Sequence, residues 1–405
     1  MTHSEILKRW AMFLKLIGVI LLPYQQELAE ALLLFPETVK LTQCRQSGKS
    51  FVIGLVCFFL MYILKWDIVV TAPTLPQTRH IMKHVLRCQD KVRAKFHYSN
   101  KYSLSLKRRG SIQCLSGSET ANVEGPSADL VIVEEHQDLT MEHVSAAFLP
   151  MLSWTDGLLW SCGIGGASGS VAERDDVEFV WSLPYQEVIK VKPGYERLVE
   201  AARKEMLPEE FAAHYECQTL DMSAKRLISN MQSYAVKDYE DSLTVVGIDW
   251  GKRLDQSVVT VVDKVEKNFF ITGWLVPTGS YDEQVLQIVE YLKDDVAYDE
   301  IISETNGVGD GCTDMLIKEM GSDGIFVTGL QIDQDWKTEQ AKLVHRTSKN
   351  GQLKYNKEHE LSGACIKDLK KVDYKMLDTD HVKCTHSDFL SSLFCALHTQ
   401  GVAYL

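Results

Sequence analysis

Residues 39–64 read VKLTQCRQSGKSFVIGLVCFFLMYIL. The first part, 39–43, predicts a short strand, and the apolar run 49–64 predicts a buried helix. Between them lies a loop of small and polar residues that ends in Gly-Lys-Ser. A strand, a tight loop and Gly-Lys-Ser at the start of a helix form the arrangement in which backbone N–H groups hold phosphate. This stretch therefore predicts a phosphate-binding α/β domain.

The loop 44–50 carries residues expected to contact a nucleotide. Lys49 is expected to reach the β- and γ-phosphates, and Ser50 to ligate Mg²⁺. The full G-x-x-x-x-G-K-[ST] pattern is not met, because Gln43 stands at the position of the first glycine. A plain surface loop is the alternative. The position of the loop between a strand and a long apolar helix favours the phosphate site.

Three further apolar segments, 67–71, 129–133 and 158–162, predict buried strands of a parallel sheet. Because helical segments separate them, the sheet should belong to an α/β fold. The strand 129–133 is followed by Glu134 and Glu135. We expect Glu134 in the Mg²⁺ shell and Glu135 to polarise the attacking water, although a strand capped by solvated acids would look the same.

Other segments give weaker signals. Ser161 or Cys162, at the end of a predicted strand, would act as a sensor. Tyr24 and Gln25, upstream of the loop, could clamp an adenine by stacking and hydrogen bonding. The basic cluster 107–109 would contact DNA phosphates or a neighbour's nucleotide, or form a solvated hairpin tip.

The second half of the chain opens a new pattern. Residues 185–235 are charged and helical in character, and 238–241 form a polar joint. The segment 243–320 then predicts three strands, a helix, a strand and a helix, which suits a second α/β domain. We place the boundary between 230 and 242, which gives domains 1–230 and 242–405.

Three acids in this second domain lie on separate predicted elements: Asp249, Glu304 and Asp388. Carboxylates that converge in this way can hold two Mg²⁺ or Mn²⁺ ions, which activate water and stabilise the leaving oxygen of a phosphodiester. Each acid alone is more typical of a strand end or helix cap, but together they favour a metal site. Whether Asp255 or His386 joins the site stays open.

Composition narrows the class of protein. Of 405 residues, 45% are hydrophobic and 24% charged, which argues against a disordered or collagen-like chain. The net charge of −12 argues against a passive nucleic-acid coat. Ten cysteines without a C-x-x-C pair favour a reducing compartment. The run 51–64 is shorter than the about 20 residues that span a bilayer, and no signal-peptide cleavage site follows the N-terminal segment. We therefore expect a soluble, cytoplasmic protein.

In chain order the motifs are YQ, CRQSGKS, DLVIVEE, GIDWG, SETNGVG and HSD. This series resembles the large terminase subunit of tailed double-stranded DNA phages. The R-Q-x-G-K-S loop is typical of that family, and 208–216 resembles its segment between domains. The resemblance covers about residues 20 to 400. It implies an α/β fold with an N-terminal P-loop ATPase domain of the ASCE type and a C-terminal RNase H-like nuclease domain.

The resemblance also implies a function. ATP hydrolysis would move double-stranded DNA through a portal into a procapsid, and the nuclease would cut concatemeric DNA. The implied partners are double-stranded DNA, the portal protein, the small terminase subunit and further copies in a ring on the procapsid, with a monomer in solution as the alternative. The implied place is the cytoplasm of the infected host cell, without a membrane. One rival is a helicase-like repair ATPase fused to an RNase H-like nuclease. Another is a structural portal-binding subunit with a degenerate ATP site.

Residue roles carry over by motif. The implied ATP-binding residues are Gln25, Arg45, Gln46, Ser47, Gly48, Lys49, Ser50 and Glu134. The implied metal-binding residues, for Mg²⁺ with Mn²⁺ as an alternative at the nuclease site, are Ser50, Glu134, Asp249, Glu304 and Asp388. The implied catalytic residues are Glu135, Arg45, Asp249, Glu304 and Asp388.

The sequence departs from the family pattern at several positions. Glu134 stands where Asp is usual. Glu124 stands where many relatives carry the arginine that acts in trans, which leaves the arginines at 108–109 as substitutes. Asp388 lacks the second acid of many relatives, so the metal site could use Asp255 instead.

Overall fold

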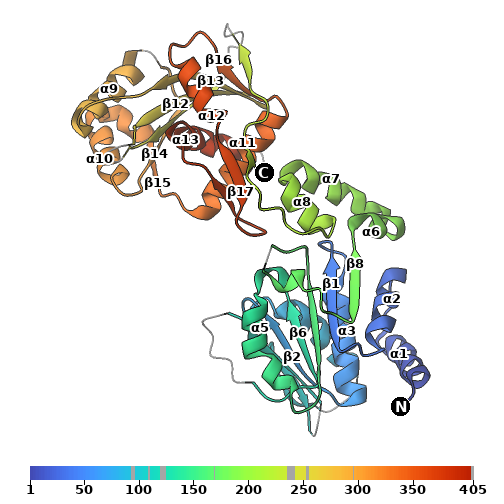
Figure 1. Cartoon of the computed structure of the whole chain (residues 1–405). Coiled ribbons are helices and arrows are strands. Elements are labelled where there is room, and N and C mark those ends of the chain that lie inside the picture. The colour runs from blue at the N-terminus through green and yellow to red at the C-terminus, as the bar shows by residue number, and fades with distance from the viewer. Residues whose placement is uncertain are drawn as a thin grey trace. The chain divides into compact units, whose positions relative to one another are not determined.

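The computed structural model describes residues 1–92, 96–107, 110–118, 125–167, 169–234, 242–251, 255–294 and 296–402. They form two compact units, each with its own sheet (Figure 1). Unit 1 comprises Met1–Arg203 and Pro208–Asp221, and unit 2 comprises Lys204–Leu207 and Met222–Leu405. In the described residues no helix is both long and apolar enough to cross a membrane.

Unit 1 is built on an eight-stranded sheet of order β3-β4-β5-β2-β6-β7-β1-β8. From β5 to β8 all neighbouring strands are parallel, whereas β3 and β4 add an antiparallel edge. The predicted strands of the first domain are thus present, with β6 placed between β2 and β7. The strands are β1 Thr38–Gln43, β2 Asp67–Ala72, β3 Phe96–Ser99, β4 Ser103–Leu106, β5 Ser111–Ser116, β6 Leu130–Glu134, β7 Leu158–Gly163 and β8 Phe179–Leu183.

The predicted apolar helix forms the centre of the unit 1 core. It is α-helical over α3 (Lys49–Phe59) and ends in a π-helical turn, Leu60–Leu64, where Lys65 adopts a positive φ of 65°. Phe58 and Phe59 are fully buried and pack with Phe13 of α1. The other helices are α1 His3–Ile17, α2 Pro23–Leu32, α4 Arg79–Gln89, α5 Met141–Ala147, α6 Tyr185–Val191, α7 Glu196–Glu205 and α8 Pro208–Tyr215.

Unit 2 contains a seven-stranded sheet of order β10-β16-β13-β12-β11-β14-β15. β11, β12 and β13 form an antiparallel meander, and β14 joins β11 in parallel, which matches the strand and helix order expected from 243 onward. Unit 2 also contains a small three-stranded sheet of order β18-β17-β9. The strands are β9 Lys225–Arg226, β10 Gln232–Tyr234, β11 Leu243–Asp249, β12 Val258–Val265, β13 Asn268–Leu275, β14 Glu300–Glu304, β15 Val327–Leu330, β16 Leu353–Asn356, β17 Asp373–Met376 and β18 Val382–Cys384.

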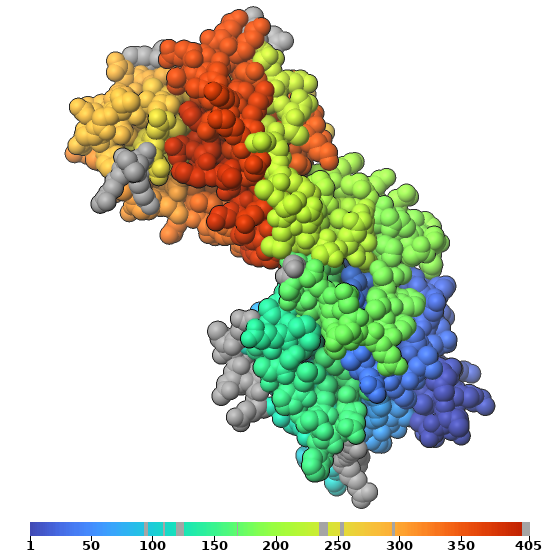
Figure 2. Space-filling view, in the orientation of Figure 1, coloured from blue at the N-terminus to red at the C-terminus, as the bar shows by residue number. Residues whose placement is uncertain are grey.

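One helix packs unusually closely on the unit 2 sheet. A Cβ at Gly247 of β11 would lie 2.1 Å from the Ser392 carbonyl oxygen and 2.2 Å from the Ala396 backbone nitrogen, both in α13. Only glycine allows the two backbones to approach so closely. In Figure 2 the red C-terminal segments and the yellow-orange segment around α9 lie side by side on unit 2. The helices are α9 Tyr281–Asp294, α10 Gly309–Met320, α11 Gln334–Lys349, α12 Ser362–Leu369 and α13 Asp388–Val402.

The boundary between the units lies earlier than the sequence indicated. Residues 222–234 belong to unit 2, because β9 pairs with β17 and β10 pairs with β16. Leu227 is fully buried in this unit. The helical character expected over 185–235 ends at Tyr215, since the described residues beyond it contain no helix before α9. Short edge strands with little periodicity give no clear signal in a sequence.

Candidate nucleotide site and candidate nuclease site

The phosphate loop connects β1 to α3 and takes two backbone conformations that most residues avoid. Gln46 has φ 58° and Gly48 has φ 93°. The loop is held from outside by β8 and α8: the Cys44 N–H donates to the Leu183 carbonyl, and the Arg45 N–H donates to the His214 carbonyl, each at 3.0 Å. The N–H groups of Cys44 and Arg45 are therefore already used within the protein.

The two residues predicted to clamp an adenine both contact the loop. The Tyr24 hydroxyl donates to the Ser47 carbonyl at 2.8 Å, and the Gln25 Nε2 donates to the same oxygen at 3.3 Å. A Cβ at Gly48 would lie 2.5 Å from the Gln25 Nε2. Gln25 is buried and its hydrogen bond helps to fix the loop. The same side chain is the one predicted to contact the adenine.

The predicted Mg²⁺ ligands lie together. The Ser50 hydroxyl donates to Glu134 Oε1 at 2.6 Å, and Glu134 is completely buried at the end of β6. Among the described residues its second oxygen, Oε2, has no hydrogen-bond partner. Burial raises the pKa of Glu134 to about 7 even though Lys49 opposes the shift. A buried oxygen without a partner next to a hydroxyl fits a divalent cation, which would satisfy it.

Glu135 lies beside Lys49 and is held in a strained position. Its φ is 53°, and its Oε2 accepts a hydrogen bond from Gln137 Nε2 at 2.8 Å. Burial alone would raise the pKa of Glu135, but Lys49 and Gln137 outweigh it and the net shift is downward. Burial likewise opposes the charge on Lys49, yet Glu135, Cys162 and Glu134 raise the Lys49 pKa. Glu135 is therefore ionised and can polarise a water.

The end of β7 contacts the segment after Glu135. His136 Nε2 lies 2.9 Å from the Ile164 carbonyl oxygen, and the Ile164 N–H donates to Gln137 Oε1 at 3.3 Å. Burial lowers the pKa of His136 to about 3, so its ring is neutral. The Ser161 hydroxyl, one of the two predicted sensors, donates to the Val39 carbonyl of β1 at 3.0 Å. Sequence reasoning missed His136 and Gln137, because only the folded sheet brings β6 and β7 together.

Other predicted residues of this unit are placed less directly. Arg45 is exposed, and its charge helps to lower the Glu135 pKa. Cys162 is buried at the end of β7 near Lys49. Glu124 and the arginines at 108–109 lie outside the described residues.

In unit 2 the structure brings Asp249 and Glu304 into contact. They end the neighbouring parallel strands β11 and β14, where Ile248 pairs with Ser303. Burial, then a side-chain hydrogen bond with Glu304 and its charge, raise the pKa of Asp249 to about 9. When two carboxyl groups lie this close together, they share a proton unless a cation lies between them. The pair fits a divalent cation for that reason.

Asp388, at the start of α13, belongs to the same acidic region but is held by other groups. Its Oδ2 accepts a hydrogen bond from the Gln256 N–H at 3.2 Å, and its Oδ1 lies 3.2 Å from His386 Nε2. Asp255 Oδ1 lies 3.8 Å from the same His386 nitrogen. The structure thus brings both open candidates, Asp255 and His386, to Asp388. The negative charge of Asp388 contributes to the raised pKa of Asp249. The ligand atoms of Asp249, Glu304 and Asp388 nevertheless do not all lie within 4.8 Å of one another.

Lys337 of α11 was missed by sequence reasoning. Its positive charge lowers the pKa of Asp249 and so opposes the upward shift from burial and from Glu304. No motif surrounds Lys337 in the sequence. Only the packing of α11 onto α13 brings it to the acids.

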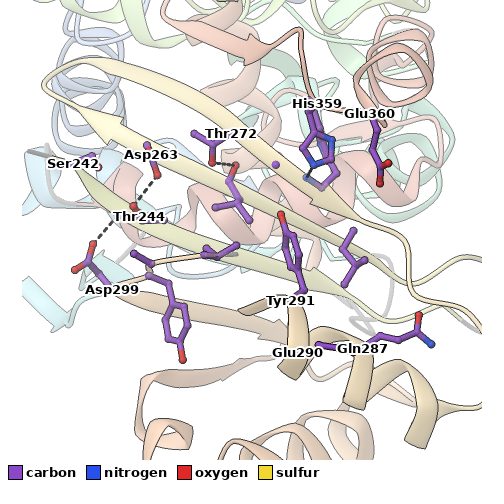
Figure 3. A pocket seen from close by; sticks show the side chains of 17 residues that line it. Ser242, Thr244, Asp263, Thr272, Gln287, Glu290, Tyr291, Asp299, His359 and Glu360 are labelled. Atoms are coloured by element: carbon purple, nitrogen blue, oxygen red, sulfur yellow. Dashed lines mark hydrogen bonds between the residues drawn. The ribbon is translucent and has the colours of Figure 1, made fainter. Parts of the chain in front are cut away.

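A cavity of about 1080 Å³ lies elsewhere in unit 2, between the β11–β13 meander and α9. Figure 3 shows Thr244 between two acids of its wall. The Thr244 hydroxyl donates to Asp263 and its N–H to Asp299, each at 2.7 Å. None of the predicted nuclease acids lines this cavity, so it is separate from the nuclease site.

Comparison with solved structures identifies the fold. The large terminase from a thermophilic bacteriophage superposes with a TM-score of 0.57 at 8% identity, over 90% of this chain and 94% of that one. The chain has the large-terminase fold. The same phage protein in complex with ADP gives 0.56 at 7% identity over 90% and 94%, and in complex with ATP-γ-S 0.55 at 9% over 89% and 93%.

The resemblance to large terminases is thereby confirmed at the level of fold, as is the predicted α/β fold class with two units, the first of which carries the phosphate loop on a largely parallel sheet. A family model described as the helicase domain of the RNA cytidine acetyltransferases NAT10/TcmA matches residues 41–152, which contain the phosphate loop and β6. A search of curated proteins found no match to this large-terminase-like chain.

Proposed function

We propose that this chain is a viral DNA-packaging motor: an ATP-driven translocase of double-stranded DNA with a metal-dependent endonuclease. The observation that carries the proposal is the presence of two separate acidic centres on a large-terminase fold. One is Ser50, Glu134 and Glu135 beside Lys49, and the other is Asp249 with Glu304. The first suits nucleotide hydrolysis, and the second suits phosphodiester cleavage.

In the first centre each residue has one chemical task. Lys49 neutralises charge on the β- and γ-phosphates. Ser50 and Glu134 would hold Mg²⁺, which supplies charge neutralisation between the phosphates. Glu135, kept ionised by Lys49 and Gln137, orients and polarises the attacking water.

In the second centre Asp249 and Glu304 would hold one divalent cation between them, which supplies activated water at neutral pH. Asp388, oriented by His386 and the Gln256 N–H, completes the ligand set as DNA binds. Mg²⁺ or Mn²⁺ suits this all-oxygen donor set.

The proposed partners are double-stranded DNA, a portal protein, a small terminase subunit and further copies of this chain in a ring on a procapsid, within an infected host cell. The test measures three activities on the purified protein: ATP hydrolysis, plasmid nicking in Mg²⁺ or Mn²⁺, and displacement of a third strand from a triplex by movement along the duplex. ATP hydrolysis without displacement, even when a portal-bearing procapsid is supplied, would contradict the motor.

A second candidate is a helicase-like repair ATPase fused to a nuclease. The match of residues 41–152 to a helicase-domain model favours it. The two candidates differ in their product: a helicase separates the strands of a forked duplex, whereas a packaging motor moves along an intact one. A fluorescent forked-duplex assay run beside the triplex assay distinguishes them.

A further inference from the structure

His80, at the start of α4, lies beside the two acids that follow β6. One nitrogen of His80 and one carboxylate oxygen each of Glu134 and Glu135 all lie within 4.8 Å of one another. His80 is exposed, Glu135 is half-buried and Glu134 is buried. Neither the phosphate-loop motif nor the β6 motif contains this histidine.

The fold brings His80 to this place and holds it there. β2 and β6 are neighbouring parallel strands, so the chain leaving β2 passes the end of β6 before α4 begins. The turn between β2 and α4 is ordered by its own hydrogen bonds. The Thr78 hydroxyl donates to the Leu75 carbonyl at 2.6 Å, and the His80 N–H donates to the Gln77 carbonyl at 3.0 Å. The position of His80 therefore follows from the sheet order.

A second observation points to a ligand at the same place. Glu134 Oε2 is buried and, among the described residues, has no hydrogen-bond partner. Leaving a buried carboxylate oxygen unsatisfied is costly, because it has lost water and gained nothing. Lys49 and, more weakly, Arg45 offset part of the local negative charge, but neither donates a hydrogen bond to this oxygen. A cation bound by the acids would satisfy the oxygen.

The donor set selects the kind of cation. Mg²⁺ prefers oxygen ligands alone, whereas an imidazole nitrogen beside carboxylates suits Mn²⁺, Co²⁺ and Zn²⁺. We propose that His80, Glu134 and Glu135 form a site for a transition-metal dication. It differs from the Mg²⁺ position at Ser50 and Glu134 in its imidazole and in needing no nucleotide.

A consequence rests on the proposed function. Glu134 and Glu135 cannot serve the transition-metal ion and the Mg²⁺–ATP complex together, so the ion and the nucleotide exclude each other. Mg²⁺–ATP should displace the bound ion. Direct metal binding is measured without ATP turnover, so a failure of this site is distinguishable from a failure of the ATPase proposal.

The experiment titrates Co²⁺ into full-length, nucleotide-free protein in an Asp249→Asn and His386→Ala background, which weakens divalent binding at the nuclease site and removes its imidazole. Three chains are compared: this background, the same with His80→Ala, and the same with His97→Ala. His97 is an exposed histidine of β3 in unit 1 and serves as the matched control. Circular dichroism checks that all three fold.

We expect the background and the His97→Ala chain to bind Co²⁺ alike, and His80→Ala to lose affinity by more than about tenfold. With Mn²⁺, pulsed electron paramagnetic resonance should detect coupling to an imidazole nitrogen that vanishes in His80→Ala. Glu134→Gln, introduced into the same background, should also abolish binding of the ion at this site. Equal Co²⁺ binding by the background and His80→Ala, or equal losses in His80→Ala and His97→Ala, would overturn the proposal.

Discussion

Lys49 lies near two acids, Glu134 and Glu135, and its charge lowers the pKa of both. Its ammonium opposes the rise in the Glu134 pKa and is a main reason that Glu135 stays ionised. We predict that Lys49→Ala lowers ATP hydrolysis by at least about a hundredfold, because both phosphate binding and the charge state of the acids are lost. ATP hydrolysis and plasmid nicking are measured on one preparation. Nicking should persist, and its loss in a folded variant would contradict the separation of the two centres.

Glu135→Gln isolates the role of one charge. The amide keeps the length of the side chain but cannot polarise water, so nucleotide binding should survive while turnover falls by about 10²–10⁴-fold. Equilibrium binding of a fluorescent ATP analogue measures the retained nucleotide affinity, and steady-state hydrolysis measures the loss of turnover. Hydrolysis near the wild-type rate would make Glu134 the better candidate for the base.

Asp249→Asn should act in opposite directions on cleavage and on stability. It removes a proposed metal ligand, so nicking in Mn²⁺ should fall by orders of magnitude. It also replaces an acid whose raised pKa, about 9, obliges the metal-free fold to take up a proton at neutral pH. Because asparagine needs no such proton, the metal-free protein should melt at a higher temperature. Nicking assays and thermal melts in EDTA measure both. Undiminished nicking would remove Asp249 from the site.

Asp255→Asn is the companion variant. Asp255 Oδ1 lies 3.8 Å from His386 Nε2, the same ring nitrogen that Asp388 Oδ1 approaches at 3.2 Å. If it only helps to orient His386, nicking should fall less than about tenfold, whereas a metal ligand would behave like Asp249. A Mn²⁺ titration of the nicking rate separates the two roles, since a lost ligand raises the Mn²⁺ concentration needed for half-maximal nicking.

At the scale of elements, the phosphate loop and β6 were predictable because each motif is contiguous in the chain and lies where an apolar strand ends. His136, Gln137 and Lys337 were not, since their neighbours come from β7 and from the α11–α13 packing, which no local pattern encodes. The small strands β9 and β10 were missed because two or three residues carry no periodicity.

The contact between β11 and α13 gives a prediction about one element pair. Gly247→Ala places a Cβ against two backbone atoms of α13, so it should destabilise unit 2 by about 1–3 kcal/mol or more. Gly311→Ala in α10 is the matched control, because a Cβ there has no atom within 4 Å and alanine favours the helix. Urea unfolding followed by intrinsic fluorescence should show a loss for the first variant only. Similar midpoints for the two would contradict the close packing.

At the scale of the whole molecule, the position of 222–234 predicts how the chain can be divided. A fragment 222–405 keeps β9 and β10 with their partners, whereas 242–405 leaves the edges of β16 and β17 bare and loses the buried Leu227. We expect the longer fragment to melt at a higher temperature and to aggregate less, because unpaired edge strands promote association. Differential scanning fluorimetry and light scattering test this expectation. Identical behaviour would mean that 222–234 adds nothing to unit 2.

The packing of α13 on β11 also orders events during synthesis. β11 supplies Asp249 and leaves the ribosome well before Asp388 and the helix that covers Gly247. A ribosome that stalls before Asp388 would release a chain whose unit 1 is complete and whose proposed nuclease site lacks both Asp388 and the helix that begins there. Under the proposed nuclease function, DNA cleavage would begin only late in translation, so unfinished copies of the chain would not cut nearby DNA.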